Sequence, residues 1–249
     1  MLIDLHAHSH LTKGCELNPR QVLDRAGAFG LDGVAFTETN TQDGADELLE
    51  LAAQSTLKIF IGLELLTDKG QYLCFFPQPQ RVPEPVQMWG SNREKPWSAV
   101  ECLPKLKSLG AAIVAARPYD REFDHPAGDF ILTLPYLSAV EGYNAKLRQT
   151  ANELALEAAE SLKLPAVGGS DARASLDEVG RGATLFKKPV RTQVELVEAL
   201  LGRDYWPVMI GELPKLMRPG EARDLENRKE GGRRRRKPGR GGRGGGWKS

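Results

Sequence analysis

Short apolar runs alternate with helix-like stretches over most of the chain. Seven runs have the character of buried strands, and they fall at Leu2–Leu5, Gly33–Thr37, Lys58–Leu63, Tyr72–Phe76, Ala111–Ala115, Ala139–Tyr143 and Leu164–Val167. Apolar residues at helical spacing predict helices at Pro19–Phe29, Gln42–Ala53, Ala99–Leu109, Leu147–Leu162 and Gln193–Leu201. Strands that alternate with helices imply parallel pairing through right-handed crossovers. The pattern predicts an α/β fold with few hairpins, which favours a barrel over an open sheet.

Local signals mark where the helices begin and end. Asn18 and Thr192 have the side chains of helix N-caps, and Gly30 and Gly110 follow helix ends. One segment breaks the alternation: residues 77–97 hold five prolines and two tryptophans and read as a long irregular loop. A lid over a site and a plain surface insertion both fit this loop.

The formal net charge of +1 hides an asymmetry between the body and the C-terminus. Residues 228–249 hold ten Lys/Arg and one acidic residue, which leaves 24 basic and 32 acidic residues elsewhere. We expect a barrel domain over 1–210, a linker over 211–227 and a disordered tail over 228–249. Arg-Gly sequences bind RNA or single strands through phosphate contacts and stacking, so the tail predicts RNA binding by Arg233, Arg234, Arg235, Arg236, Arg240 and Arg243. A solubilising tail, or one that folds back on the acidic body, is the alternative.

The composition excludes several classes of protein. No apolar run approaches the length of a membrane span, and the first residues enter a strand without the pattern of a secretory signal. Cys15, Cys74 and Cys102 are widely spaced and form no Cys-x-x-Cys pair, which argues against a disulfide framework and a thiolate zinc site. We therefore expect a cytoplasmic protein with no membrane partner.

Polar residues gather where the predicted strands end. His6 and His8 lie two residues apart, so their side chains share a face, and Asp4 could orient one imidazole. Glu64 and Asp171 follow two later strands, and the C-terminal ends of barrel strands meet at one rim. Two histidines and two carboxylates suit zinc, manganese or iron. The alternative is that both carboxylates only cap helices or pair with Arg117 and Arg173.

Several segments in register resemble the signature segments of the PHP (polymerase and histidinol phosphatase) family. They are Asp-Leu-His-Ala-His-Ser at 4–9, Glu-Leu-Asn-Pro at 16–19, Gly-Leu-Asp-Gly-Val-Ala-Phe-Thr at 30–37, Gly-Leu-Glu at 62–64, Ala-Arg-Pro-Tyr at 116–119, Glu-Gly-Tyr-Asn at 141–144 and Gly-Gly-Ser-Asp-Ala at 168–172. The resemblance covers about residues 1–210. It implies a distorted seven-stranded TIM-like barrel with up to three metal ions that hydrolyses phosphate esters.

The chain departs from the family at four positions where the resemblance implies metal ligands. Lys13, Thr39, Arg117 and Arg173 stand there, and three of these four are basic. The retained set of His6, His8, Glu64 and Asp171 resembles the ligands of a single metal site. The resemblance thus implies one site kept and two removed.

Two hypotheses follow from these residues. In the first, the chain is a metal-dependent phosphoesterase that acts on a phosphorylated nucleotide or nucleic-acid end. Lys13, Arg117 and Arg173 then bind phosphate oxygens, the two arginines take part in catalysis, and Glu38 or Glu141 serves as general base. In the second, the same cations neutralise Glu64 and Asp171, and the barrel is an inactive module that binds phosphate and RNA.

Overall fold

The computed structural model describes residues 1–78 and 96–211, which form one unit, Met1–Gly211. The strands are β1 (Leu2–Ala7), β2 (Gly33–Thr39), β3 (Lys58–Thr67), β4 (Gly70–Phe75), β5 (Ala112–Ala116), β6 (Ala139–Asn144), β7 (Ala166–Gly169), β8 (Gly182–Phe186) and β9 (Tyr205–Met209). The α-helices are α1 (Pro19–Ala28), α2 (Ala45–Gln54), α4 (Ala99–Ser108), α5 (Gln149–Ser161) and α6 (Gln193–Gly202), with short 3-10 helices η1 (Gly128–Thr133) and η2 (Leu176–Glu178). The predicted linker beyond Gly211, the tail and most of the proline-rich loop lie outside the described residues.

The described strands form one sheet that curls into a nearly closed barrel. Its order is β7-β6-β5-β4-β3-β2-β1-β8-β9. The two ends of this order meet, because β7 lies beside β8. The Thr184 hydroxyl of β8 accepts from the Gly168 backbone N–H of β7 and donates to the Gly168 carbonyl, both at 2.9 Å. Beyond β7, the Asp171 amide donates to the His6 carbonyl at 2.7 Å. The expectation of a distorted TIM-like barrel is confirmed.

The number and direction of the strands differ from the expectation in two ways. Strand β4 pairs antiparallel with both β3 and β5, and the hairpin between Thr67 and Gly70 joins β3 to β4. Two further strands, β8 and β9, pair antiparallel with each other after the last predicted strand. The described part of the structure therefore has nine strands rather than seven. The expected parallel pairing holds among β1, β2 and β3 and among β5, β6 and β7, but not for β4, β8 and β9.

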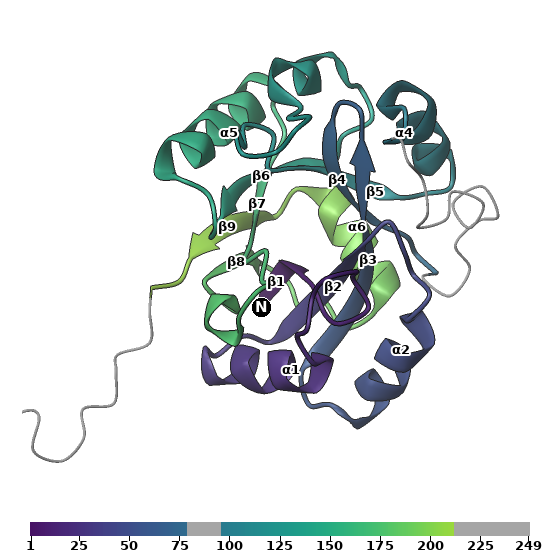
Figure 1. The fold of residues 1–249 in the computed structure, drawn as a ribbon, viewed down its shortest axis with the longest axis vertical. Coiled ribbons are helices and arrows are strands. Elements are labelled where there is room, and N and C mark those ends of the chain that lie inside the picture. Colours follow the sequence, from purple (N-terminus) through teal and green to yellow (C-terminus); the bar gives the residue numbers. More distant parts are fainter. Residues whose placement is uncertain (79–95, 212–249) are drawn as a thin grey trace, which may run out of the picture. The chain divides into compact units, whose positions relative to one another are not determined.

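Helices cover the outside of the strands, while α6 packs against their inner face. Figure 1 shows α1, α2, α4 and α5 around the periphery. Leu196, Val197 and Leu200 of α6 belong to a buried cluster with inward residues such as Phe60 and Phe75. Asn18 caps α1 by accepting from the Arg20 amide, and Thr192 caps α6 by accepting from the Glu195 amide, which confirms both predicted caps.

Side chains alternate between the two faces of each strand, and the inward face carries both apolar and polar residues. On β3, Phe60 and Glu64 share one face, and on β4 Phe75 and Gln71 share one face. Phe60 and Phe75 pack in the cluster that includes α6, whereas Glu64 and Gln71 lie towards the other end of their strands. The barrel interior thus has an apolar end covered by α6 and a polar end formed by carboxyl ends of the parallel strands.

The junction of β7 and β8 depends on glycines that let two backbones approach closely. A methyl group at Gly182 would overlap the Gly169 carbonyl oxygen, which is backbone and cannot swing aside. We expect Gly182→Ala to lower the free energy of unfolding by about 2–3 kcal/mol, as overpacking does. Gly202→Ala is the matched control, since nothing lies within 4 Å of a methyl group there. Chemical denaturation of both variants checks this, and equal stabilities would contradict it.

Candidate metal centre and phosphate-binding rim

All four predicted ligands converge at the polar end of the barrel. His6 Nε2 lies 3.4 Å from Glu64 Oε1 and 3.6 Å from Asp171 Oδ1. His8 Nε2 lies 3.6 Å from the same Asp171 oxygen. The side chains of all four residues have no exposed surface. The prediction that residues from separate strand ends meet at one rim holds for this set.

Glu141, rather than Asp4, orients the His6 imidazole. His6 Nδ1 donates to Glu141 Oε1 at 2.7 Å, which leaves Nε2 directed at Glu64 and Asp171. Asp4 instead accepts from the backbone N–H of His6 at 3.1 Å and of Ser170 at 2.9 Å. The expectation that Asp4 orients an imidazole is therefore wrong, and Asp4 joins the backbones of β1 and the segment after β7.

A hydroxyl relay fixes the tautomer of His8. The Thr12 hydroxyl donates its single proton to Glu38 Oε2, so its oxygen accepts from His8 Nδ1, 3.2 Å away. His8 Nε2 consequently presents a lone pair to the site. Glu38 also accepts from the Ser9 hydroxyl at 2.6 Å and is almost fully buried. The structure thus places Glu38 behind His8, where it holds the Thr12 hydroxyl in position, and its role as general base stays a prediction.

Arg117 and Arg173 reach the cluster from its rim. Arg117 Nη1 donates to Asp171 Oδ2 at 2.6 Å, and Arg173 Nη2 donates to Glu64 Oε2 at 2.8 Å. Arg173 Nη2 also lies 2.9 Å from His8 Nε2. Their side chains keep 15% and 30% of their surface exposed, so both guanidinium groups stand between the buried carboxylates and solvent.

Gln71 links Glu64 to Arg117 within the cluster, and no sequence pattern predicted it. Its amide nitrogen donates to Glu64 Oε1 at 3.2 Å, and its oxygen accepts from Arg117 Nη2 at 2.6 Å. Because β4 runs antiparallel, residues at its start lie at the rim where the parallel strands end. Residues that follow parallel strands predict this rim, whereas Gln71 begins an antiparallel strand, so only a hairpin signal at 67–70 would have indicated it.

Buried charges balance within the cluster. Burial alone would lower the pKa of His6, but the Glu141 and Asp171 carboxylates raise it to about 10. Burial would raise the pKa values of Glu64 and Asp171, but neighbouring His6 and the rim arginines hold both well below the usual range. Burial lowers the pKa of His8, which stays neutral. Counted over the groups in direct contact, the carboxylates of Glu64, Asp171 and Glu141 face the guanidinium groups of Arg117 and Arg173 and the His6 imidazolium, so these six groups are formally neutral.

Comparison with known proteins agrees with this arrangement. A family model described as PHP domain matches residues 4–86, and one described as PHP-associated matches residues 149–204. MJ1587, an uncharacterised protein of Methanocaldococcus jannaschii, is 30% identical over 167 residues, which are 63% of this chain and 90% of the relative. The chain belongs to the PHP family. Its PHP-associated segment runs from α5 to α6 and the start of the connection after α6.

Solved structures of PHP-like proteins share the fold. A two-domain protein from Bacteroides vulgatus, described as containing a predicted PHP-like metal-dependent phosphoesterase, aligns with a TM-score of 0.65 at 18% identity, over 84% of this chain and 65% of that one. Endonuclease Q, solved with a 27-mer duplex carrying an abasic lesion at its active site, aligns with a TM-score of 0.57 at 18% identity, over 81% and 57% of the two chains. In residues 1–78 and 96–211 of our PHP chain, no helix is long and apolar enough to cross a membrane.

The PHP residues that are present fit a metal ion. His6 Nε2 and Asp171 Oδ1 are buried atoms without a hydrogen-bond partner in the described structure, and both face the same point. One ligand atom each from His6, His8 and Asp171 lies within 4.8 Å of the others. Buried polar atoms are normally paired, so two convergent orphans indicate a ligand between them. Imidazole nitrogens with carboxylate oxygens are the donor set that zinc, manganese and iron accept.

Of the other predicted site residues, Lys13 alone lies within the described residues, and it is not brought to this PHP site. Lys13 is exposed on the loop after β1 and forms no ion pair with the cluster within the described structure. Phosphate binding by Lys13 stays a prediction. The six tail arginines lie outside the described residues.

The raised pKa of His6 predicts an alkaline loss of stability in the metal-free PHP chain. Protonated His6 contributes stability fully below its ordinary pKa of 6.5, and this contribution is lost as the pH rises through about 10. The expected loss is on the order of 4 kcal/mol. Urea denaturation in EDTA between pH 6 and 10 measures it. His6→Gln should flatten the slope, whereas His10→Gln, at an exposed histidine, should keep it.

Proposed function

We propose that this chain is a metal-dependent phosphoesterase with one retained metal site, acting on a phosphorylated nucleotide or a nucleic-acid end. One observation carries the proposal. Two buried atoms without a hydrogen-bond partner, His6 Nε2 and Asp171 Oδ1, converge beneath two partly exposed arginines at the mouth of the barrel. A site for a cation and donors for an anion are thus in direct contact, because each arginine donates to one of the ligand carboxylates.

The residues of the chain divide the work of such a reaction. His6, His8, Glu64 and Asp171 would hold the ion. Bound there, a divalent ion supplies Lewis-acid activation of water and of the phosphoryl group. Arg117 and Arg173 bind the phosphate oxygens, because a guanidinium fork matches two oxygens at once. Glu141 and Glu38 hold the two imidazoles in register through direct and Thr12-mediated hydrogen bonds.

Charge favours an anionic substrate once an ion is bound. The metal-free cluster is neutral only because His6 carries a second proton. A divalent ion on Nε2 takes the place of one positive charge, so the loaded cluster gains one net positive charge. Phosphate esters carry negative charge, and the rim arginines face them from the open side. The Endonuclease Q structure, with its duplex DNA, supports including nucleic acids among the substrates tested.

Phosphate release tests this function directly. Protein stripped with EDTA and reloaded with zinc, manganese or iron is given nucleoside monophosphates and 5′- and 3′-phosphorylated oligonucleotides. We expect metal-dependent release that is lost in His6→Ala and kept in His10→Ala, whose histidine pairs with Glu47 outside the cluster. An intact, metal-loaded chain that cleaves none of these esters would overturn the proposal.

A second candidate function rests on the direct ion pairs of the rim. Arg117 with Asp171 and Arg173 with Glu64 already neutralise two ligand carboxylates. In that case the barrel is an inactive module that binds a phosphate group through its arginines. It predicts that a phosphorylated nucleotide binds equally well in EDTA and in metal, with no turnover. Metal-dependent turnover excludes it.

We infer that the tail, residues 228–249, binds RNA in either case. Its ten Lys/Arg residues would release counterions from the phosphate backbone, so affinity should fall steeply with salt. Deleting 228–249 should weaken binding of a single-stranded RNA at least about tenfold at low salt, measured by filter binding. Unchanged binding by the truncated protein would exclude this role.

A further inference from the structure

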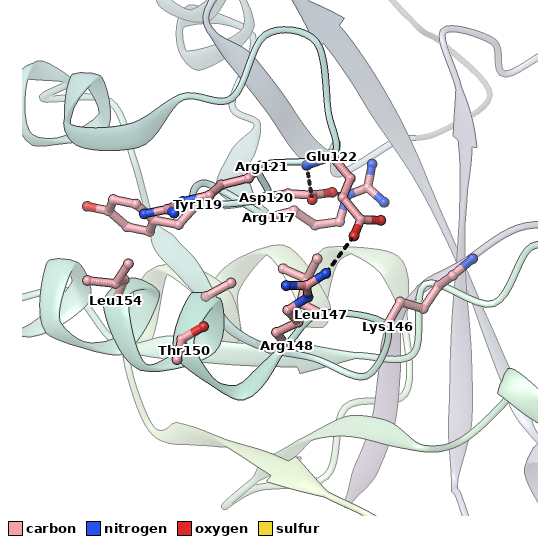
Figure 2. Close-up of a pocket in the computed structure, with 11 residues that line it drawn as sticks. Arg117, Tyr119, Asp120, Arg121, Glu122, Lys146, Leu147, Arg148, Thr150 and Leu154 are labelled. Carbon is pink, nitrogen blue, oxygen red and sulfur yellow. Dashed lines mark hydrogen bonds and ion pairs between the residues drawn. The ribbon is translucent and has the colours of Figure 1, made fainter.

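A cavity of about 470 Å³ opens beside the rim, with Arg117 as the residue that it shares with the cluster. One wall is the loop after β5, residues 117–122, and the other is the segment that enters α5, residues 146–154 (Figure 2). The volume lies in the range of small-molecule sites, about 300–1,000 Å³. A substrate whose phosphate lies at the metal centre would extend into this cavity.

The lining carries an excess of positive charge. Four cations, Arg117, Arg121, Lys146 and Arg148, line the cavity with two carboxylates, and Lys146 also pairs at 3.6 Å with Glu178, which lies outside the lining. One carboxylate, Asp120, is almost buried and lies 3.8 Å from Arg117 Nε. The other, Glu122, meets Arg148 across the cavity at 3.5 Å, where both side chains are largely exposed and their pairing is weak. The positive end of the α5 dipole adds to this potential.

Two apolar side chains, Tyr119 and Leu154, line one end of the cavity. Figure 2 shows Tyr119 and Leu154 facing each other across one end, with Lys146 at the other. The Tyr119 hydroxyl donates to Asp129 at 3.0 Å, so the ring is held from its far side. Leu154 keeps 40% of its surface exposed, although it is a large apolar residue. A flat apolar group would cover both.

We propose that this cavity binds the nucleoside part of a phosphorylated strand end, with a base against Tyr119 and Leu154 and an internucleotide phosphate towards Lys146 and Arg148. The proposal deepens the proposed function and rests on it for the position of the terminal phosphate. The two ends of the cavity match the two parts of a nucleotide, and Arg117 joins them to the cluster. Bases stack on aromatic rings with little sequence preference, so no particular base is required.

Binding of a 5′-thiophosphorylated dinucleotide, which resists turnover, tests the two ends separately. Its affinity for the full chain is measured by calorimetry beside that of an abasic counterpart with the same phosphates. Tyr119→Ala should weaken the dinucleotide about tenfold and leave the abasic ligand unchanged. Tyr119→Phe keeps the ring and should bind like the wild type. Arg148→Ala should weaken both ligands about equally, because both keep the internucleotide phosphate.

Two surface variants serve as controls. Arg191→Ala and Leu201→Ala change exposed residues outside the cavity and should bind both ligands normally. Wild-type affinity in Tyr119→Ala, an equal loss for the abasic ligand, or no dinucleotide binding by the wild type would each overturn the assignment. If the chain hydrolyses no ester while the variants show the expected pattern, the proposed function fails and the nucleotide site stands.

Discussion

Replacing Asp171 with alanine should weaken divalent-metal binding by more than about 100-fold. Removing a residue that only supports a ligand costs about 10–100-fold, and Asp171 contributes a ligand atom itself. Its Oδ1 is one of the two orphaned buried atoms and lies 3.6 Å from both imidazole Nε2 atoms. Mass spectrometry for metal content and competition with a fluorescent zinc chelator measure the loss.

Three further variants show whether the loss of metal binding in Asp171→Ala comes from the missing ligand or from a disturbed fold. Glu141→Gln keeps the shape but weakens the hold on His6 Nδ1, so we expect an intermediate loss of about 10–100-fold. Asp24→Ala, at an exposed acid of α1, should bind metal normally. Asp171→Asn covers the case in which the alanine variant unfolds, because it keeps an acceptor for Arg117. Stoichiometric metal in folded Asp171→Asn would contradict a centre built on this carboxylate.

Hydrophobic periodicity predicts where the strands and helices of the barrel lie. It does not predict in which direction each strand runs. Buried runs and capped amphipathic helices placed seven strands and five helices close to their observed positions. The direction of β4 depends on the tight connection after Thr67, and neither Asp68 nor Lys69 gives a strong turn signal. Strand β9 contains Pro207, which cannot donate to a ladder and is tolerated there because β9 ends the sheet order.

The candidate site shows the same division. Parallel strand ends bring His6, Glu64 and Asp171 to one rim by topology alone, so order in the sequence was enough to group them. Partners within the site depend on side-chain direction, which the sequence does not fix. The sequence interpretation has Asp4 as a residue that could orient an imidazole, yet Glu141 of β6 holds His6 Nδ1, and Asp4 accepts from the His6 backbone N–H. Tertiary geometry, not proximity in sequence, selects these partners.

Replacing Arg173 with methionine should move metal affinity and turnover in opposite directions. Its Nη2 lies 2.9 Å from His8 Nε2 and 2.8 Å from Glu64 Oε2, so it competes with a cation for both ligands. Two unit charges 4 Å apart interact by about 4 kcal/mol at an effective dielectric constant of 20, and even a third of this is about tenfold in affinity. We therefore expect metal to bind about tenfold more tightly in Arg173→Met.

Turnover should fall in the same variant. The substitution removes the Arg173 guanidinium, which in the proposed function also binds the phosphate. Losing one donor to the developing charge of a transition state costs about 100- to 1,000-fold in kcat. Chelator competition and phosphate release on the same preparation measure the two effects, with Arg191→Met as the exposed control. Tighter metal binding with faster turnover would show that Arg173 only blocks the centre. Weaker metal binding would show that Arg173 holds Glu64 and His8 in place for the ion, which contradicts competition between them.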